Sequence, residues 1–188
     1  GDTGIRIDEG HAMTKGEIKI KNTNYGIRVY GTFNPFKGSV SIDDASQGIR
    51  VGTGSFFESS VPIDLKNIRN RGVQVDTGGI FAIYQDGSLN ISCLNTCERG
   101  LSTSQATVSI NNTSISGVPR AINAWKSNID IYNLTATGDG TTDQDLVEVE
   151  GGSVSNLRNV TISNSGANGL KFSDSQSYID NLTSKNNK

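Results

Sequence analysis

The chain has 188 residues, a formal net charge of −2 and a hydrophobic content of 34%. This charge gives no reason to expect a nucleic acid or a membrane surface as partner, and no apolar run reaches the length of a transmembrane helix. The hydrophobic content is low for a compact globule but sufficient for a solenoid, whose narrow core needs few inward residues per coil. We expect one domain over residues 1–188, cut from a longer chain because it begins and ends within a repeat.

A Gly-Ile-x-Val segment recurs along the chain and predicts one strand in every repeat. It occupies residues 26–29 and 48–51, with the close variants Gly-Ile-Arg-Ile at residues 4–7 and Gly-Val-Gln-Val at residues 72–75, and weaker versions at residues 100–101, 121–122, 147–149 and 169–172. A second pattern has two apolar residues two apart, with a small polar anchor two positions later. The anchors are Asn22, Asp44, Asn67, Cys93, Asn112, Asn133, Asn159 and Asn181. A period of two residues is typical of a strand with one buried face.

The spacing of the anchors predicts the fold class. Successive anchors are 22, 23, 26, 19, 21, 26 and 22 residues apart. Coils of about 23 residues with two or three short strands are typical of an all-β, parallel β-helix solenoid, here of about eight coils. We expect the anchor side chains to form an internal asparagine ladder, interrupted at Asp44, which cannot donate, and at Cys93, which donates poorly.

The first four coils hold more residues between the Gly-Ile segment and the anchor than the last four do. This difference predicts insertion loops at residues 8–16, 30–38, 52–60 and 76–87. Large aromatic residues on stacked loops favour ligand binding, whereas the alternative is that the rings pack on one another as a second core. The aromatic residues in question are Tyr30, Phe33, Phe36, Phe56, Phe57, Phe81 and Tyr84.

Arg6, Arg28 and Arg50 are 22 residues apart and are predicted to form an outward-pointing row. Neighbouring guanidinium groups repel one another unless a negative group lies against them. Acidic neighbours such as Asp8, Asp43 or Glu58 would neutralise the row within the protein. The other interpretation is a groove for an anionic glycan, because arginine holds carboxylate or sulfate groups bidentately while aromatic rings stack on sugars.

These two features define the candidate ligand-binding site. Its members are Arg6, Arg28, Arg50, Tyr30, Phe33, Phe36, Phe56, Phe57 and Tyr84. A nucleic-acid ligand is disfavoured because basic residues elsewhere do not extend the arginine row.

Cys93 and Cys97 are the only cysteines, and His11 is the only histidine. A disulfide loop and two free thiols are both compatible with this spacing, and the disulfide fits an extracellular protein. We expect no cofactor and no metal site. The acidic loop at residues 139–145 has calcium-ligand chemistry, but its spacing fits no EF-hand.

The repeat resembles a known family over nearly the whole chain. A Gly-Ile-x-Val segment, then Ser-Val-Ser-Ile-x-Asp at residues 39–44, then another Gly-Ile segment, resembles right-handed parallel β-helices of the pectate-lyase-like group. Within this group the chain is most similar to passenger domains of Gram-negative autotransporters of the pertactin type, in which closely spaced cysteines like Cys93 and Cys97 also occur. The resemblance implies an extracellular protein, either on the cell surface or anchored to the outer membrane.

Three functions remain open from the sequence. The favoured one is a non-enzymatic surface adhesin that binds a glycan, a polysaccharide or another surface protein. The second is a polysaccharide lyase or hydrolase similar to phage tailspike depolymerases, which belong to the same group and would need two carboxylates facing a groove. The candidate carboxylates are Glu9, Glu58, Asp76 and Asp86. The third is a purely structural stalk.

Overall fold

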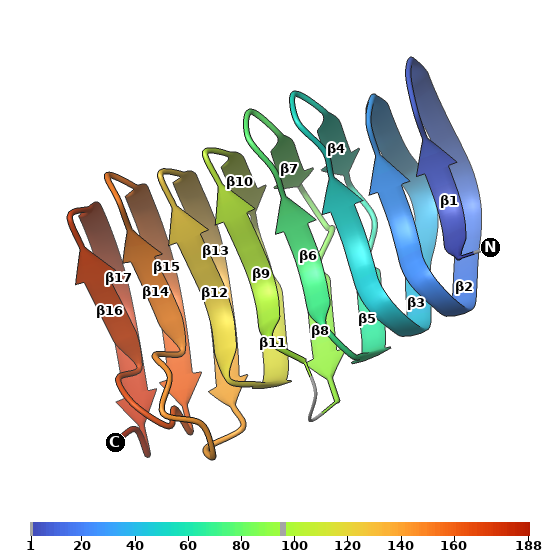
Figure 1. Cartoon of the computed structure of the whole chain (residues 1–188). Helices are drawn as coiled ribbons and strands as arrows, with labels where there is room; N and C mark the ends of the chain where they lie inside the picture. The colour runs from blue at the N-terminus through green and yellow to red at the C-terminus, as the bar shows by residue number, and fades with distance from the viewer. Residues whose placement is uncertain (1, 95–96) are drawn as a thin grey trace.

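A computed structural model describes residues 2–94 and 97–188 of the chain as stacked β-coils. Figure 1 shows the coils forming one rod, with the N-terminus and the C-terminus at opposite ends. The strands are β1 (Thr3–Ile7), β2 (His11–Val29), β3 (Thr32–Val51), β4 (Phe56–Ser59), β5 (Ile63–Ile68), β6 (Arg71–Val75), β7 (Ile80–Ile83), β8 (Leu89–Cys93), β9 (Arg99–Ser104), β10 (Thr107–Ile110), β11 (Thr113–Val118), β12 (Arg120–Trp125), β13 (Asn128–Gly138), β14 (Val147–Glu150), β15 (Val154–Ser163), β16 (Leu170–Ser173) and β17 (Gln176–Lys185).

Each coil has three sides, and every strand pairs in parallel with its equivalent in the neighbouring coil or coils. The first side contains residues 25–29 and 47–51 together with β1, β6, β9, β12, β14 and β16. The second side contains residues 11–14 and 32–35, β4, β7, β10 and the beginnings of β13, β15 and β17. The third side contains residues 17–21 and 39–43, β5, β8, β11 and the ends of β13, β15 and β17. The predicted all-β parallel β-helix of about eight coils is confirmed.

The Gly-Ile segments line the first side and supply one column of the core. Each isoleucine or its equivalent lies in register with the next, and each fully buried aliphatic side chain contributes roughly 1.5 to 3 kcal/mol. The column runs through Ile5, Ile27, Ile49, Val73, Leu101, Ile122, Val147 and Leu170.

The glycine of the segment is required by the close approach of successive coils. A Cβ atom added at Gly26 would lie 2.5 Å from the carbonyl oxygen of Gly48. The same 2.5 Å distance would separate a Cβ at Gly48 from the carbonyl oxygen of Gly72. Since Cβ atoms do not come this close to a backbone oxygen, a larger residue would push two coils apart.

The apolar pattern that precedes the anchors changes side halfway along the rod. In the first four coils it lies on the third side, where Leu65 pairs with Ile91. In the last four it lies on the second side, where Ile110 pairs with Ile131. The short 19-residue step between Cys93 and Asn112 therefore marks a change of side and not a shorter coil.

The prediction of insertion loops in the first four coils is wrong, because each of these segments contains a strand of the second side. Residues 32–35 and 56–59 and strand β7 pair with one another as neighbouring strands of the second side. The longer distance from the Gly-Ile segment to the anchor arises because it includes this whole second strand. Both halves of the rod thus have the same three-sided coil.

Among the described residues, the asparagine ladder lies in the last four coils. The Nδ2 atoms of Asn133, Asn159 and Asn181 donate to the Oδ1 atom of the preceding asparagine at 2.9, 2.9 and 3.0 Å. These side chains lie at the surface, so the expected internal position is wrong. In the first half, Asn67 donates to Asp43 and not to the anchor Asp44, so the ladder is interrupted at Asp44 as expected.

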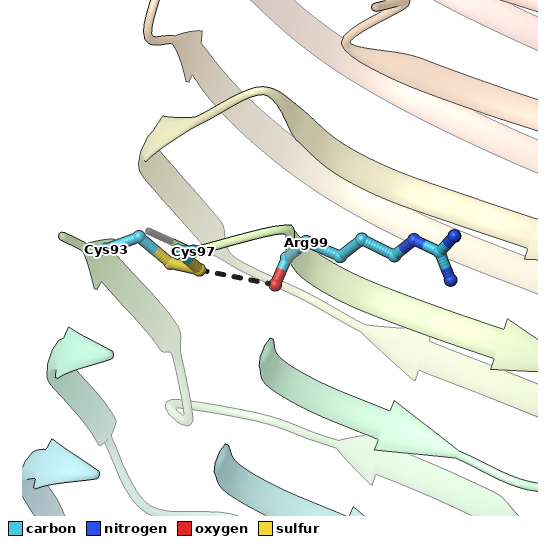
Figure 2. Close-up of a disulfide and its surroundings, with 3 residues drawn as sticks. All are labelled: Cys93, Cys97 and Arg99. Carbon is cyan, nitrogen blue, oxygen red and sulfur yellow. Dashed lines mark hydrogen bonds between the residues drawn. A yellow bond between two sulfur atoms is a disulfide. The ribbon is translucent and has the colours of Figure 1, made fainter. Parts of the chain in front are cut away.

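Cys93 and Cys97 form a disulfide, as one of the two interpretations predicted. Figure 2 shows this bond, which joins the last residue of β8 to Cys97, two residues before β9 begins. Asn95 and Thr96, within this loop, lie outside the described residues. The Cys97 sulfur lies 3.6 Å from the carbonyl oxygen of Arg99, a contact rather than a donated hydrogen bond because a disulfide sulfur carries no hydrogen.

Candidate functional site

Arg6, Arg28 and Arg50 lie in one row on the first side, as their spacing predicted. Arg6 pairs in register with Arg28, and Arg28 pairs with Arg50. Adjacent strands place these residues about 4.8 Å apart along the rod.

Each arginine of this row has a partner within the protein. The Nε atom of Arg6 donates to Asp8 at 2.5 Å, and this carboxylate raises the pKa of Arg6. Arg50 contacts Asp76 through Nε at 2.9 Å and through Nη2 at 2.8 Å. Burial alone would lower the pKa of Arg50, but the hydrogen bond and charge of Asp76 outweigh it and raise this pKa.

Arg28, between these two ion pairs, is held by aromatic rings. Its guanidinium carbon lies 4.2 Å from the Tyr25 ring centroid and 5.5 Å from the Tyr30 centroid. Its Nη2 atom also donates to the Tyr30 hydroxyl at 2.7 Å. The positive charges of the first arginine row are therefore balanced by groups of the protein itself, which favours the alternative of internal neutralisation. Of the expected acidic neighbours only Asp8 contributes, and Asp76 and the two tyrosines hold the other two arginines.

Two of the predicted ligand-binding aromatic residues, Phe33 and Phe57, are buried in the core, and so is Phe81. The Phe33 and Phe57 rings meet edge to face with centroids 5.7 Å apart, and Phe57 stacks on Phe81 at 5.0 Å. Phe33 and Phe57 are thus inaccessible to a ligand, and the alternative of rings packing on one another is confirmed for this stack. The physical reason is that strand alternation turns these three side chains inward.

The remaining candidates lie at the surface. Phe36 and Tyr84 are each 44% exposed, and Tyr132, which the sequence did not single out, is 45% exposed. Phe56 is also exposed on the second side, whereas Tyr30 is half-buried on the first side beside Arg28.

Phe36, Tyr84 and Tyr132 form what we call the aromatic column, at one edge of the second side. Tyr84 directly follows Ile83, and Tyr132 directly follows Ile131. Ile83 and Ile131 occupy the same position in coils two apart, because both pair with Ile110 of the coil between them. Phe36 and Tyr84 line one hollow of about 170 Å³, and Ser60 of the intervening coil donates to the Phe36 carbonyl oxygen. One aromatic ring therefore recurs at every second coil, a spacing of about 9 to 10 Å.

Polar groups accompany the aromatic column. The Phe36–Tyr84 hollow also contains Glu58, and a hollow of about 190 Å³ beside Tyr132 contains Asp130 and Arg158. A third, adjoining hollow of about 330 Å³ is lined by Thr107, Val108, Ser109, Asn128, Ile129, Asp130, Val154 and Asn156. The second side thus presents rings, carboxylates and amides along one edge.

Two of the candidate catalytic carboxylates, Glu58 and Asp76, lie on different sides of the coil. Asp76 lies on the first side and is bound to Arg50. Glu58 and Asp130 share a position on the second side but are three coils apart. This separation of about 14 Å exceeds the roughly 5 to 10 Å between the two carboxylates of glycosidases.

No three His, Cys, Asp or Glu side chains among the described residues come together as a metal site. In the acidic loop, the Oδ1 atom of Asp139 accepts hydrogen bonds from the backbone of Thr141 and Thr142 at 2.9 and 3.3 Å. Asp145 accepts from Asn168 and pairs with Lys171. These two carboxylates thus have partners within the protein. No helix within residues 2–94 and 97–188 is long and apolar enough to span a bilayer.

A second arginine row, which sequence reasoning missed, lies on the first side beside the first row. Arg71, Arg99 and Arg120 pair in register on β6, β9 and β12. A sequence signal for it exists, because each of these arginines directly precedes the small residue that opens the Gly-Ile segment or its equivalent.

Comparison with known proteins identified no relative: no family model, no curated protein and no solved structure matches this chain.

Proposed function

We propose that this chain is a surface-exposed β-helix adhesin segment, of the kind found in autotransporter passenger domains, that binds a glycan along its second side. The observation that carries the proposal is the aromatic column of Phe36, Tyr84 and Tyr132. Exposed rings at a regular spacing offer flat apolar faces on which the apolar faces of sugars can stack. Two coil spacings, about 9 to 10 Å, are comparable to the length of one disaccharide in an extended chain.

The polar groups around the rings fit the same ligand class. Glu58, Asp130 and Asn156 line hollows beside or between the rings, where they are available to bind sugar hydroxyls. An extracellular location is part of the proposal, and the Cys93–Cys97 disulfide supports it because such bonds persist in oxidising compartments.

A glycan array tests this proposal with the wild type, a Tyr84→Ala/Tyr132→Ala double variant and a Trp125→Ala control. Trp125 is also exposed but lies on the first side. We expect the double variant to lose about tenfold in affinity per ring removed and the control to bind as the wild type does.

The competing functions give different results in the same samples. If the wild type releases reducing ends from a polysaccharide, the adhesin proposal is wrong and the chain is a depolymerase. Retention of no glycan by the wild type would contradict glycan binding, and leave a protein-binding surface or a structural stalk.

A further inference from the structure

The second arginine row differs from the first in how its charges are balanced. Arg71 donates from Nη1 to Gln74 at 2.9 Å and lies 3.7 Å from the Glu98 carboxylate. Arg120 is bound to Glu148 at 2.8 Å. Arg99 lies between them and has no side-chain hydrogen bond or ion pair with any residue in the described part of the chain.

The neighbourhood carries more positive than negative groups. The cations are Arg71, Arg99, Arg120 and Lys171, and the carboxylates are Glu98, Asp145 and Glu148. Lys171 binds both Asp145 and Glu148, at 3.3 and 2.9 Å. The carboxylates are therefore committed to other cations, and the charge of Arg99 is the surplus.

Electrostatics at Arg99 indicate the same imbalance. Burial lowers the pKa of Arg99, and the charges of Arg71 and Arg120 lower it further, against smaller opposing effects of Glu98 and Glu148. An anion placed against Arg99 would relieve this repulsion.

The row also has unused hydrogen-bond donors. The Nε atoms of Arg71 and Arg120 are buried and have no hydrogen-bond partner among the described residues, a property that the Nε atom of Arg28 in the first row shares. Buried polar groups without a partner are rare in proteins, and each one requires an explanation. An acceptor at the row is one such explanation.

There is room for such an acceptor. A hollow of about 400 Å³ adjoins the row and is lined by Cys97, Glu98, Arg99, Pro119, Arg120 and Gln144. Figure 2 shows the Arg99 side chain extended away from the Cys93–Cys97 disulfide, which closes the loop just before β9. Among the described lining residues Glu98 is the carboxylate, and its side chain is 60% exposed and lies 3.7 Å from Arg71.

From this geometry we infer that Arg99, flanked by Arg71 and Arg120, binds an oxyanion group carried by an acidic polysaccharide. The guanidinium fork of arginine matches the two oxygens of a carboxylate or a sulfate. The polysaccharide as the source of the anion rests on the proposed glycan-binding function, whereas binding of a free oxyanion does not depend on it.

The first test compares Arg99→Gln with Arg6→Gln. The control removes the same charge from the same side of the rod, four coils away, at an arginine that already has Asp8 as partner. Binding is measured by calorimetry with heparin, with hyaluronan, which carries carboxylates but no sulfates, and with neutral dextran. We expect Arg99→Gln to weaken heparin binding about tenfold and Arg6→Gln to leave it within about twofold.

The two acidic polysaccharides separate the two oxyanions. An equal loss on hyaluronan identifies a carboxylate as sufficient, and a loss on heparin alone identifies sulfate. Equal affinity of the two variants for both polysaccharides would overturn the anion site and leave glycan binding through the aromatic column intact.

The second test needs no polysaccharide. Phenylglyoxal modifies free guanidinium groups, and mass spectrometry reports the rate at each arginine. Sodium sulfate, at an ionic strength matched with sodium chloride, is expected to slow the modification of Arg99 and not that of Arg6. Protection of Arg99 in a protein that binds no glycan would support the anion site and contradict the proposed function. Equal rates at Arg99 with and without sulfate would overturn the inference.

Discussion

The two arginine rows have the same stacked geometry but differ at one position in how their charges are paired. Both lie on the first side, and both stack three arginines on neighbouring coils. In the first row, Asp8, Asp76 and two tyrosines compensate every guanidinium, whereas in the second row Arg99 has no such partner among the described residues. A row of charges is therefore no evidence for a ligand until the register of the neighbouring carboxylates is known.

The largest loss of stability is expected when the buried partner of Arg120 in the second row is removed. Arg120 and Glu148 have side chains only 19% and 8% exposed, so Glu148→Gln leaves a desolvated guanidinium without its counter-charge. We expect the free energy of unfolding, measured in urea, to fall by about 3 kcal/mol. The control is Glu98→Gln, which removes an exposed carboxylate 3.7 Å from Arg71 and should cost less than about 0.5 kcal/mol. Equal losses in the two variants would refute the special position of Glu148.

Removing the carboxylate partner of one arginine in the first row should leave that arginine without an ion pair among the described residues, as Arg99 is in the second row, and is expected to lower stability moderately. Asp76→Asn removes the partner of Arg50, whose side chain is only partly exposed. We expect stability to fall by about 1 kcal/mol and heparin affinity to rise about threefold, because a guanidinium becomes free to bind an anion. Asp8→Asn provides the matched change at an exposed pair and should leave stability unchanged. Unaltered heparin affinity in Asp76→Asn would break the parallel between the rows.

Acid should lower the stability of the protein through Asp145, which pairs with Lys171 beside the second row. Burial would raise the pKa of this carboxyl, but hydrogen bonds from Asn168 and Lys171 outweigh it, so the pKa is lowered. A lowered pKa gives stability that is present above the ordinary value of about 3.9 and is lost as the pH falls through the folded-state pKa. Asp145→Asn should therefore be less stable than the wild type by about 1 kcal/mol at pH 7, and the difference should shrink below about pH 4. Urea unfolding between pH 2.5 and 7 measures it, and a difference independent of pH would show that Asp145 contributes through packing alone.

The smallest expected change in stability is that of Arg99→Gln, and its sign distinguishes the two rows most directly. Arg99→Gln removes a repelling charge, so stability should rise by about 0.5 kcal/mol at low salt and approach the wild-type value at high salt. Arg50→Gln should instead lower stability, because Asp76 loses its partner. Thermal unfolding at two salt concentrations checks both signs. A destabilised Arg99→Gln protein would mean that this guanidinium has a stabilising partner after all.

Much of the fold follows from local repetition in the sequence. The Gly-Ile segments predict strands, their recurrence predicts about eight stacked coils, and the 22-residue spacing of Arg6, Arg28 and Arg50 predicts the outward row. These predictions hold because a repeat that matches one coil places equivalent residues above one another. The second arginine row could have been found in the same way, from the arginine before each small residue at positions 72, 100 and 121.

The sequence alone determined a parallel solenoid and the identity of the residues that recur along it, because period and alternation are properties of the chain itself. The tertiary structure alone decided which residues face outward and which charges are paired. Phe56 and Phe57 are neighbours, yet one is exposed and the other buried, since the pairing with adjacent coils fixes which way the strand alternation points. Likewise Asp76 reaches Arg50 from 26 positions away, whereas Arg99 has no ion pair with a described residue, because stacking decides which carboxylates and guanidinium groups meet.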